Sequence, residues 1–294
     1  VLAVYDLGKL YSTDKLGEKS EEISIAKYTQ ALQGFLQIEP NSKKLKPYIQ
    51  YRIGKMFCYG LGTEQDYEKA FEWFERSAKQ KNKFAQFSLA NLYYYGSGVE
   101  KDLSQAFLWY QRSSSQGQPY AAYSIAQMYR YGEYVTKDND TAQRYYKQAL
   151  SGFLKIESDD MANDNLFYKL GQMFKLGLGT DSDVTKAIEY FRRSAEMNNK
   201  NGLFEYGKAL LTGEHIPQDT DSAVKLLEKA VKLKNSNAKR FLALEYISGE
   251  HLEQDFEKGI ALLTECADSG DVIASYRLGK IYLQGEIMPQ NLDK

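Results

Sequence analysis

Two histidines are the residues whose type and spacing come nearest to a metal or catalytic site in this chain of 294 residues. His215 and His251 stand at equivalent positions of a repeated pattern, and each follows a glutamate, Glu214 or Glu250. Imidazole and carboxylate groups are zinc ligands, but zinc sites in proteins need several converging ligands. Duplication of an exposed loop explains the pair more simply. The sequence therefore predicts no metal site.

Glycine-rich turns and two cysteines are the other candidates for chemistry. Gly60-Leu61-Gly62 resembles part of a phosphate-binding loop, but such loops follow a strand, and this one lies between two helical patterns. Cys58 has no histidine in a matching column that could activate it, so a thiol nucleophile has no support. Cys58 and Cys266 lie too far apart along the repeats to form a disulfide, which favours a reducing, cytoplasmic location. We expect a non-enzymatic protein without a cofactor.

Charge and hydropathy exclude two further classes of partner. The formal net charge is −1 and the isoelectric point is about 6.3, so nothing indicates direct binding of nucleic acid or anionic lipid. No apolar run approaches the ~20 residues that cross a membrane. The chain starts at Val1 and stops at Lys294, where a second helix should begin, so we expect a fragment of a longer protein.

Three columns of small residues recur in one register along the chain. The first contains Gly60, Gly96, Gly132, Gly177, Gly213, Gly249 and Gly285, with steps of 36 residues except for one of 45. The second contains Gly54, Ala90, Ala126, Gly171, Gly207, Ala243 and Gly279, and the third Ala70, Ala106, Ala142, Ala187, Ala223 and Gly259. Such self-similarity indicates a repeat architecture.

Each repeat has the pattern of two amphipathic helices joined by a glycine turn. Neither helix can bury its apolar stripe alone, so neighbouring repeats must stack. The predicted fold is an all-α, right-handed α-solenoid of antiparallel helix pairs, with about seven and a half repeats in one domain, residues 1–294. The predicted units are residues 3–47, 48–84, 85–120, 121–165, 166–201, 202–237, 238–273 and a partial unit 274–294.

The motif itself resembles a known family. Leu/Ile-Gly/Ala-x-x-Phe/Tyr followed by Ala-x-x-x-Phe/Tyr is similar to the tetratricopeptide pattern. The 36-residue step and the turn Gly96-Ser97-Gly98 resemble the Sel-1-like repeat, a relative of that pattern. We expect the protein to be bacterial. The resemblance implies a non-enzymatic scaffold that binds a protein or peptide. The long repeat also resembles the C-terminal repeats of mobilisation relaxases from Gram-positive bacteria, so an accessory region of a larger enzyme is the alternative.

The resemblance also implies a binding surface. In the tetratricopeptide relatives, the first helices line a concave groove in which peptides lie. Three columns would face it here: Tyr51, Phe87, Tyr123 and Tyr168; then Lys55, Asn91, Gln127 and Gln172; then Tyr59, Tyr95 and Tyr131. Residues at i, i+4 and i+8 share a helix face. The alternative is that the first column belongs to the core between repeats.

Two expectations concern stability. Trp73 and Trp109 occupy the same position of their second helices and should be buried between helices of adjacent units. Gly171 lies inside a first helix, where close approach of a second helix would explain a glycine. A change to Ala should then be mild and a change to Leu severe.

Overall fold

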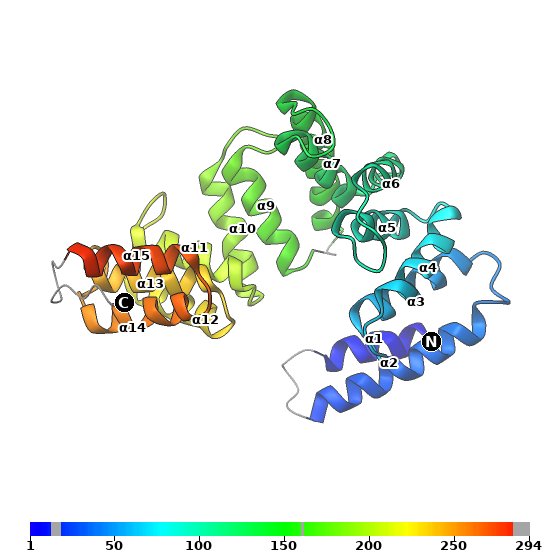
Figure 1. Cartoon of the computed structure of the whole chain (residues 1–294), viewed down its shortest axis with the longest axis horizontal. Coiled ribbons are helices and arrows are strands. Elements are labelled where there is room, and N and C mark those ends of the chain that lie inside the picture. Colours follow the sequence, from blue (N-terminus) through cyan, green and yellow to red (C-terminus); the bar gives the residue numbers. More distant parts are fainter. Residues whose placement is uncertain (13–18, 160–161, 285–294) are drawn as a thin grey trace. The chain divides into compact units, whose positions relative to one another are not determined.

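The computed structural model describes residues 1–12, 19–159 and 162–284. Within these residues every regular element is a helix, and there are fifteen of them (Figure 1). The chain folds as two compact units, Val1–Gly152 and Phe153–Lys294. None of the described helices combines the length and the apolar character that a membrane span requires. The predicted all-α solenoid of stacked helix pairs is confirmed, and the division into a single domain stays a prediction.

The first compact unit contains three complete helix pairs. The helices are α1 Leu2–Tyr11, α2 Lys19–Ile38, α3 Lys46–Tyr59, α4 Tyr67–Lys79, α5 Lys83–Tyr95, α6 Leu103–Ser115 and α7 Pro119–Tyr131, followed by α8 Asn139–Ser158, which continues past Gly152. Figure 1 shows α3 beside α4 and α5 beside α6, and α2, α4 and α6 each also pack on the first helix of the next pair. This stacking buries the apolar stripe of each helix.

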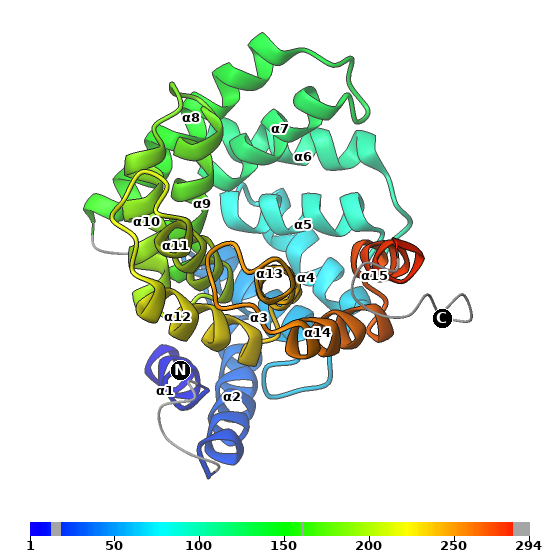
Figure 2. The ribbon, with the colours of Figure 1, turned by 90° about the vertical axis from the view of Figure 1, so that its left-hand side faces the viewer.

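The second compact unit repeats the same plan. Its helices are α9 Asp164–Leu176, α10 Val184–Glu196, α11 Lys200–Thr212, α12 Thr220–Lys232, α13 Ser236–Ser248, α14 Phe256–Asp268 and α15 Val272–Gln284. In Figure 2, α13 lies between α12 and α14, and it packs on both.

Polar caps and glycines fix where the helices begin and end. Second helices begin at an aspartate whose carboxylate accepts the backbone N–H three residues on, at 2.9–3.0 Å: Asp66, Asp102, Asp138, Asp183, Asp219 and Asp255. Such a cap contributes about 1 kcal/mol. First helices from α3 to α13 end at a glycine in the left-handed conformation, as the glycine column predicts. Gly285 lies outside the described residues.

The two tryptophans differ in burial. Trp109 is 8% exposed and belongs to a core cluster with Ala70, Phe74 and Leu89 from the neighbouring helices, so its prediction is confirmed. Trp73 is only partly buried, and its prediction is wrong. The ring packs on the edge of the core that α2 and α3 form, and the guanidinium of Arg76 lies 4.9 Å from its centroid.

Gly171 is packed more tightly than its sequence context indicates. A Cβ atom there would lie 2.5 Å from Cε1 of Phe191, whose ring is buried. Gly54 is placed in the same way, since its Cβ would lie 2.6 Å from Cδ1 of Phe74. The expectation that Gly171→Ala is mild therefore does not hold.

We expect Gly171→Ala to lower the free energy of unfolding by about 1–3 kcal/mol, because the Phe191 ring must move out of its position. The double variant Gly171→Ala/Phe191→Leu copies Ala243 and Leu263, which stand at the same positions of a later repeat and share a core cluster. Urea titration of the two single variants and the double variant measures the coupling. Strictly additive losses would contradict direct contact between the two positions.

Candidate functional site

A column of exposed tyrosines ends three successive first helices of the first compact unit. Tyr59, Tyr95 and Tyr131 are 63%, 71% and 62% exposed, and each directly precedes the glycine that ends its helix. The Lys55 ammonium lies 5.7 Å from the centroid of the Tyr59 ring, and Tyr94 meets Tyr95 edge to face at 4.9 Å. The three tyrosine rings are therefore accessible to a ligand, and the glycine that ends each helix fixes the backbone from which each ring projects.

The first column of the predicted groove is half-buried and serves packing. Tyr51 contacts Phe74 on α4, with ring centroids 6.0 Å apart, and Phe84 on α5 at 5.8 Å. Phe87 and Tyr123 contact rings on the second helices of their own repeats in the same way. Burial is the main cause that raises the pKa of Tyr51. The alternative interpretation of this column, core between repeats, describes most of its surface, and only a minor part of each side chain is left exposed to a ligand.

A second aromatic column was not predicted from the sequence. Tyr48, Phe84 and Tyr120 begin the same three first helices, and Phe84 is 42% exposed. Phe84 and Tyr120 link successive repeats because they contact Tyr51 and Phe87 of the preceding one. Their constant 36-residue step was the signal that could have revealed them.

The second column of the predicted groove carries a lysine in one repeat, Lys55, and amide side chains in the next ones, Asn91 and Gln127. Asn91 accepts a hydrogen bond from the hydroxyl of Tyr110 at 2.6 Å, which fixes its amide, and Gln127 is half-buried. Lys55 is half-buried too, and burial, followed by the neighbouring charges of Arg52 and Lys9, lowers its pKa. We define the first-helix face as Tyr59, Tyr95 and Tyr131 with Lys55, Asn91 and Gln127 and the exposed parts of Tyr51, Phe87 and Tyr123.

In the second compact unit only α9 keeps the aromatic and amide pattern. Tyr168 contacts Phe191 with ring centroids 5.9 Å apart, and Gln172 donates a hydrogen bond to the Tyr168 hydroxyl at 2.8 Å. Burial lowers the pKa of the adjacent Lys169 to about 8. Leu176, 54% exposed, stands where the first unit has tyrosine, and it lines a cavity of about 280 Å³. The predicted residues Tyr168 and Gln172 thus support each other within one helix.

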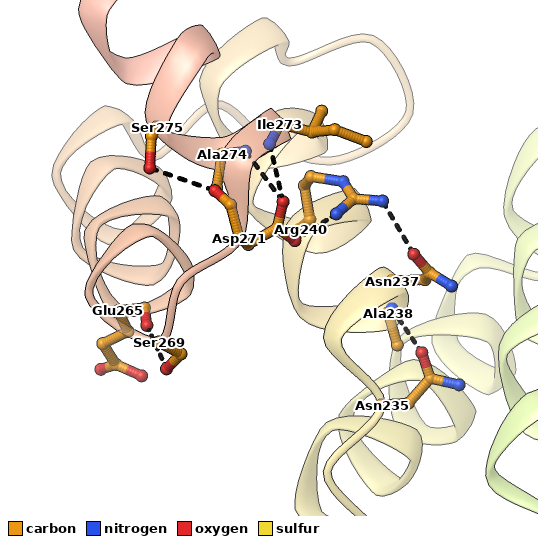
Figure 3. A network of polar contacts seen from close by, with 10 residues as sticks. All are labelled: Asn235, Asn237, Ala238, Arg240, Glu265, Ser269, Asp271, Ile273, Ala274 and Ser275. Carbon is orange, nitrogen blue, oxygen red and sulfur yellow. Dashed lines mark hydrogen bonds and ion pairs between the residues drawn. The ribbon is translucent and has the colours of Figure 1, made fainter. Parts of the chain in front are cut away.

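Further along, an ion pair replaces the aromatic residue of the first column. Figure 3 shows Arg240 of α13 between Asn237 and Asp271, the residue that precedes α15. Burial alone would raise the pKa of Asp271, but the backbone N–H of Ala274 and the Arg240 guanidinium hold it below its ordinary value. The contacts of Arg240 therefore link α13 to the start of the next first helix, α15.

The two histidines lie in separate turns. Nδ1 of His251 is 3.0 Å from a carboxylate oxygen of Glu245, and Nε2 of His215 is 3.7 Å from Glu214. In the described part of the chain, no group of three or more His, Cys, Asp or Glu side chains is placed to hold a metal ion. Both cysteines are free thiols.

The chain is similar to Sel1 repeat proteins over most of its length. The Sel1 repeat model matches residues 47–82, 83–118, 119–152, 168–199, 201–235, 236–271 and 272–294. A Sel1 repeat protein from Oxalobacter formigenes has 25% sequence identity and a TM-score of 0.60, over 83% of this chain and 95% of that one. The protective antigen c5321 of uropathogenic Escherichia coli has 25% identity and a TM-score of 0.56, over 96% of this chain and 57% of that one. No curated protein sequence matches significantly. The chain therefore belongs to the Sel1 repeat family.

Proposed function

We propose that this protein is a non-enzymatic scaffold that binds a peptide segment of a partner protein on the first-helix face. Repeats of this fold are in general protein-interaction scaffolds. The observation that carries the proposal is the column of Tyr59, Tyr95 and Tyr131, each more than 60% exposed at the same position of three successive helices. The stack of repeats does not need these rings for its core, so their recurrence favours a ligand.

The geometry suits an extended peptide. Packed helices lie about 8–10 Å apart, and an extended chain advances about 3.3 Å per residue. Because α3, α5 and α7 pack mainly on the second helices between them, neighbouring tyrosines would meet residues at least about three apart in a peptide that crosses the repeats. Tyrosine offers a large contact area at a small cost in side-chain entropy. Asn91 and Gln127 supply amide groups between the rings that can bond a peptide backbone.

The double variant Tyr95→Ala/Tyr131→Ala should lose at least about tenfold in affinity for peptides that the wild type captures on an array, because two of its three exposed rings are gone. Circular dichroism should show unchanged helix content, since both rings lie outside the core.

The matched control is Tyr67→Ala/Tyr134→Ala. These tyrosines are 39% and 55% exposed in the same compact unit, but they lie at the start of α4 and in the turn after α7. The control should bind as the wild type does. Equal capture by the wild type and by the Tyr95→Ala/Tyr131→Ala variant would place the binding surface elsewhere.

The alternative, an accessory region of a mobilisation relaxase, stays a hypothesis that concerns residues outside this chain. It is tested by the reading frame that encodes the protein. A nicking domain in the same frame would support it, and a frame that contains only repeats would contradict it.

A further inference from the structure

Three cations gather at one end of the first-helix face. Lys9 of α1 is exposed, Arg52 and Lys55 of α3 are half-buried, and Arg52 and Lys9 lie near enough to Lys55 to lower its pKa. Asn91 and Gln127 occupy the position of Lys55 in the next two repeats. Within the first compact unit the cluster is therefore confined to the α1–α3 end, whereas in the last repeat Arg277 and Lys280 stand at the positions of Arg52 and Lys55. The whole chain, with a net charge of −1, is not basic.

The described part of the chain offers these cations no carboxylate partner. Among residues 1–12, 19–159 and 162–284, no ion pair involves Lys9, Arg52 or Lys55. The groups that shift the pKa of Lys55 are Arg52, Lys9 and Cys58, and those that shift the pKa of Arg52 are tyrosines. Partly buried positive charges are costly unless they are paired. A cluster with no carboxylate partner among the described residues therefore favours an external anion.

Arg52 is held in one orientation before any ligand arrives. Its guanidinium carbon lies 4.9 Å from the Tyr5 ring centroid and 5.0 Å from that of Tyr48, and its Nε donates to the Tyr48 hydroxyl at 2.9 Å. Stacking between two rings preserves the charge while it limits the movement of the side chain. A ligand anion would then bind without the entropy cost of ordering this arginine.

We propose that Lys9, Arg52 and Lys55 form a subsite for neighbouring Asp or Glu side chains in the peptide that the first-helix face binds. This inference rests on the proposed function and specifies the peptide as acidic at one end. Three cations on two helices match more than one negative charge, which favours a pair of acidic side chains over a single terminal carboxylate. Lys55 stands one helical turn before Tyr59, so the acidic pair would lie beside the residue that contacts the tyrosine column.

The test uses two degenerate pools of fluorescein-labelled, C-terminally amidated decapeptides. The pools are otherwise free of Asp and Glu and differ only at one pair of adjacent positions, Glu-Glu in one and Gln-Gln in the other. The wild type should bind the Glu pool about tenfold more tightly, as charge-assisted hydrogen bonds are stronger than neutral ones. Lys55→Met should abolish this preference, because it should lower the affinity for the Glu pool about tenfold more than the affinity for the Gln pool. Its thermal midpoint should stay equal or rise, because a half-buried charge is lost while the length of the side chain is kept.

Lys79→Met is the control variant, since it removes one positive charge from α4, where Lys79 pairs with Glu75. It should keep the preference for the Glu pool. Equal affinity of the wild type for both pools would overturn the inference and leave the proposed function intact, provided that Tyr95→Ala/Tyr131→Ala weakens both. Failure of the wild type to bind either pool would overturn both proposals. A preference that survives in Lys55→Met would also overturn the inference, as would binding of a phosphoserine pool but not of the Glu pool.

Discussion

Replacement of Trp109 by alanine should lower the free energy of unfolding by about 3–5 kcal/mol, the usual loss when a large aromatic side chain leaves a core. Trp109 is 8% exposed and packs with Leu89 of its own repeat and with Ala70 and Phe74 of the preceding repeat. The Arg112 guanidinium lies over its ring, 4.5 Å from the ring centroid. The cavity would open between two repeats, so the interface that transmits stability along the stack would weaken.

Trp73→Ala is the internal comparison, because Trp73 stands at the same repeat position but is only partly buried. Trp73→Ala should lower the free energy of unfolding clearly less than Trp109→Ala does. Urea unfolding followed by circular dichroism at 222 nm measures both losses. Equal losses, or an unchanged midpoint for Trp109→Ala, would contradict the burial difference seen between the two repeats.

The fold followed from the sequence because its signals are local and repeated. Gly60 and its equivalents end first helices, and Asp66 and its equivalents begin second helices, so each boundary is set by one residue with a fixed backbone role. The recurrence of each signal at a constant step made the assignment secure. Helix pairs, their order and their stacking then follow, since an amphipathic helix must bury its apolar stripe.

The distribution of side chains between core and surface was harder to predict. Tyr51, Lys55 and Tyr59 occupy one helix face by periodicity, yet only Tyr59 is exposed, and the other two are half-buried. The Tyr51 ring turns toward Phe74 and Phe84, which lie on other helices. Helix periodicity gives the direction of a Cβ atom, but contacts between helices decide where a long side chain ends. The same reason explains why Trp73 is less buried than predicted and why we now expect a larger loss for Gly171→Ala.

The basic cluster could not be predicted from the repeat pattern. Lys9 belongs to the irregular first repeat, whose residues do not align with the glycine and alanine columns. Its proximity to Lys55 arises from tertiary packing, because α1 packs on α2, α2 packs on α3, and Arg52 of α3 lies over the ring of Tyr5 on α1. Arg52 aligns with Ser88 and Ser124 in the next two repeats, so a search for recurring residues passes over it. Residues that depart from a repeat are therefore the ones to examine for specificity.

The second large effect should come from Gly98→Ala, in the turn between α5 and α6. Gly98 has φ +68°, and a Cβ atom there would lie 2.3 Å from the carbonyl carbon and oxygen of Tyr67, at the start of α4. The turn thus touches the backbone of the preceding repeat. Alanine would add the cost of the left-handed conformation, about 1–2 kcal/mol, to that of separating two backbones. We expect a total loss of about 2–5 kcal/mol.

Gly117→Ala isolates the first of these two costs. Gly117 has φ +75°, but no atom lies within 4 Å of the place that its Cβ would take. Gly117→Ala should therefore lower the free energy of unfolding by only about 1–2 kcal/mol. The difference between the two variants in urea titrations measures the close contact of the turn with α4. If the two losses were equal, that contact would contribute nothing to stability, and the second glycine of each Gly-x-Gly turn would serve the local backbone alone. A larger loss for Gly98→Ala means that this glycine sets how closely successive repeats approach.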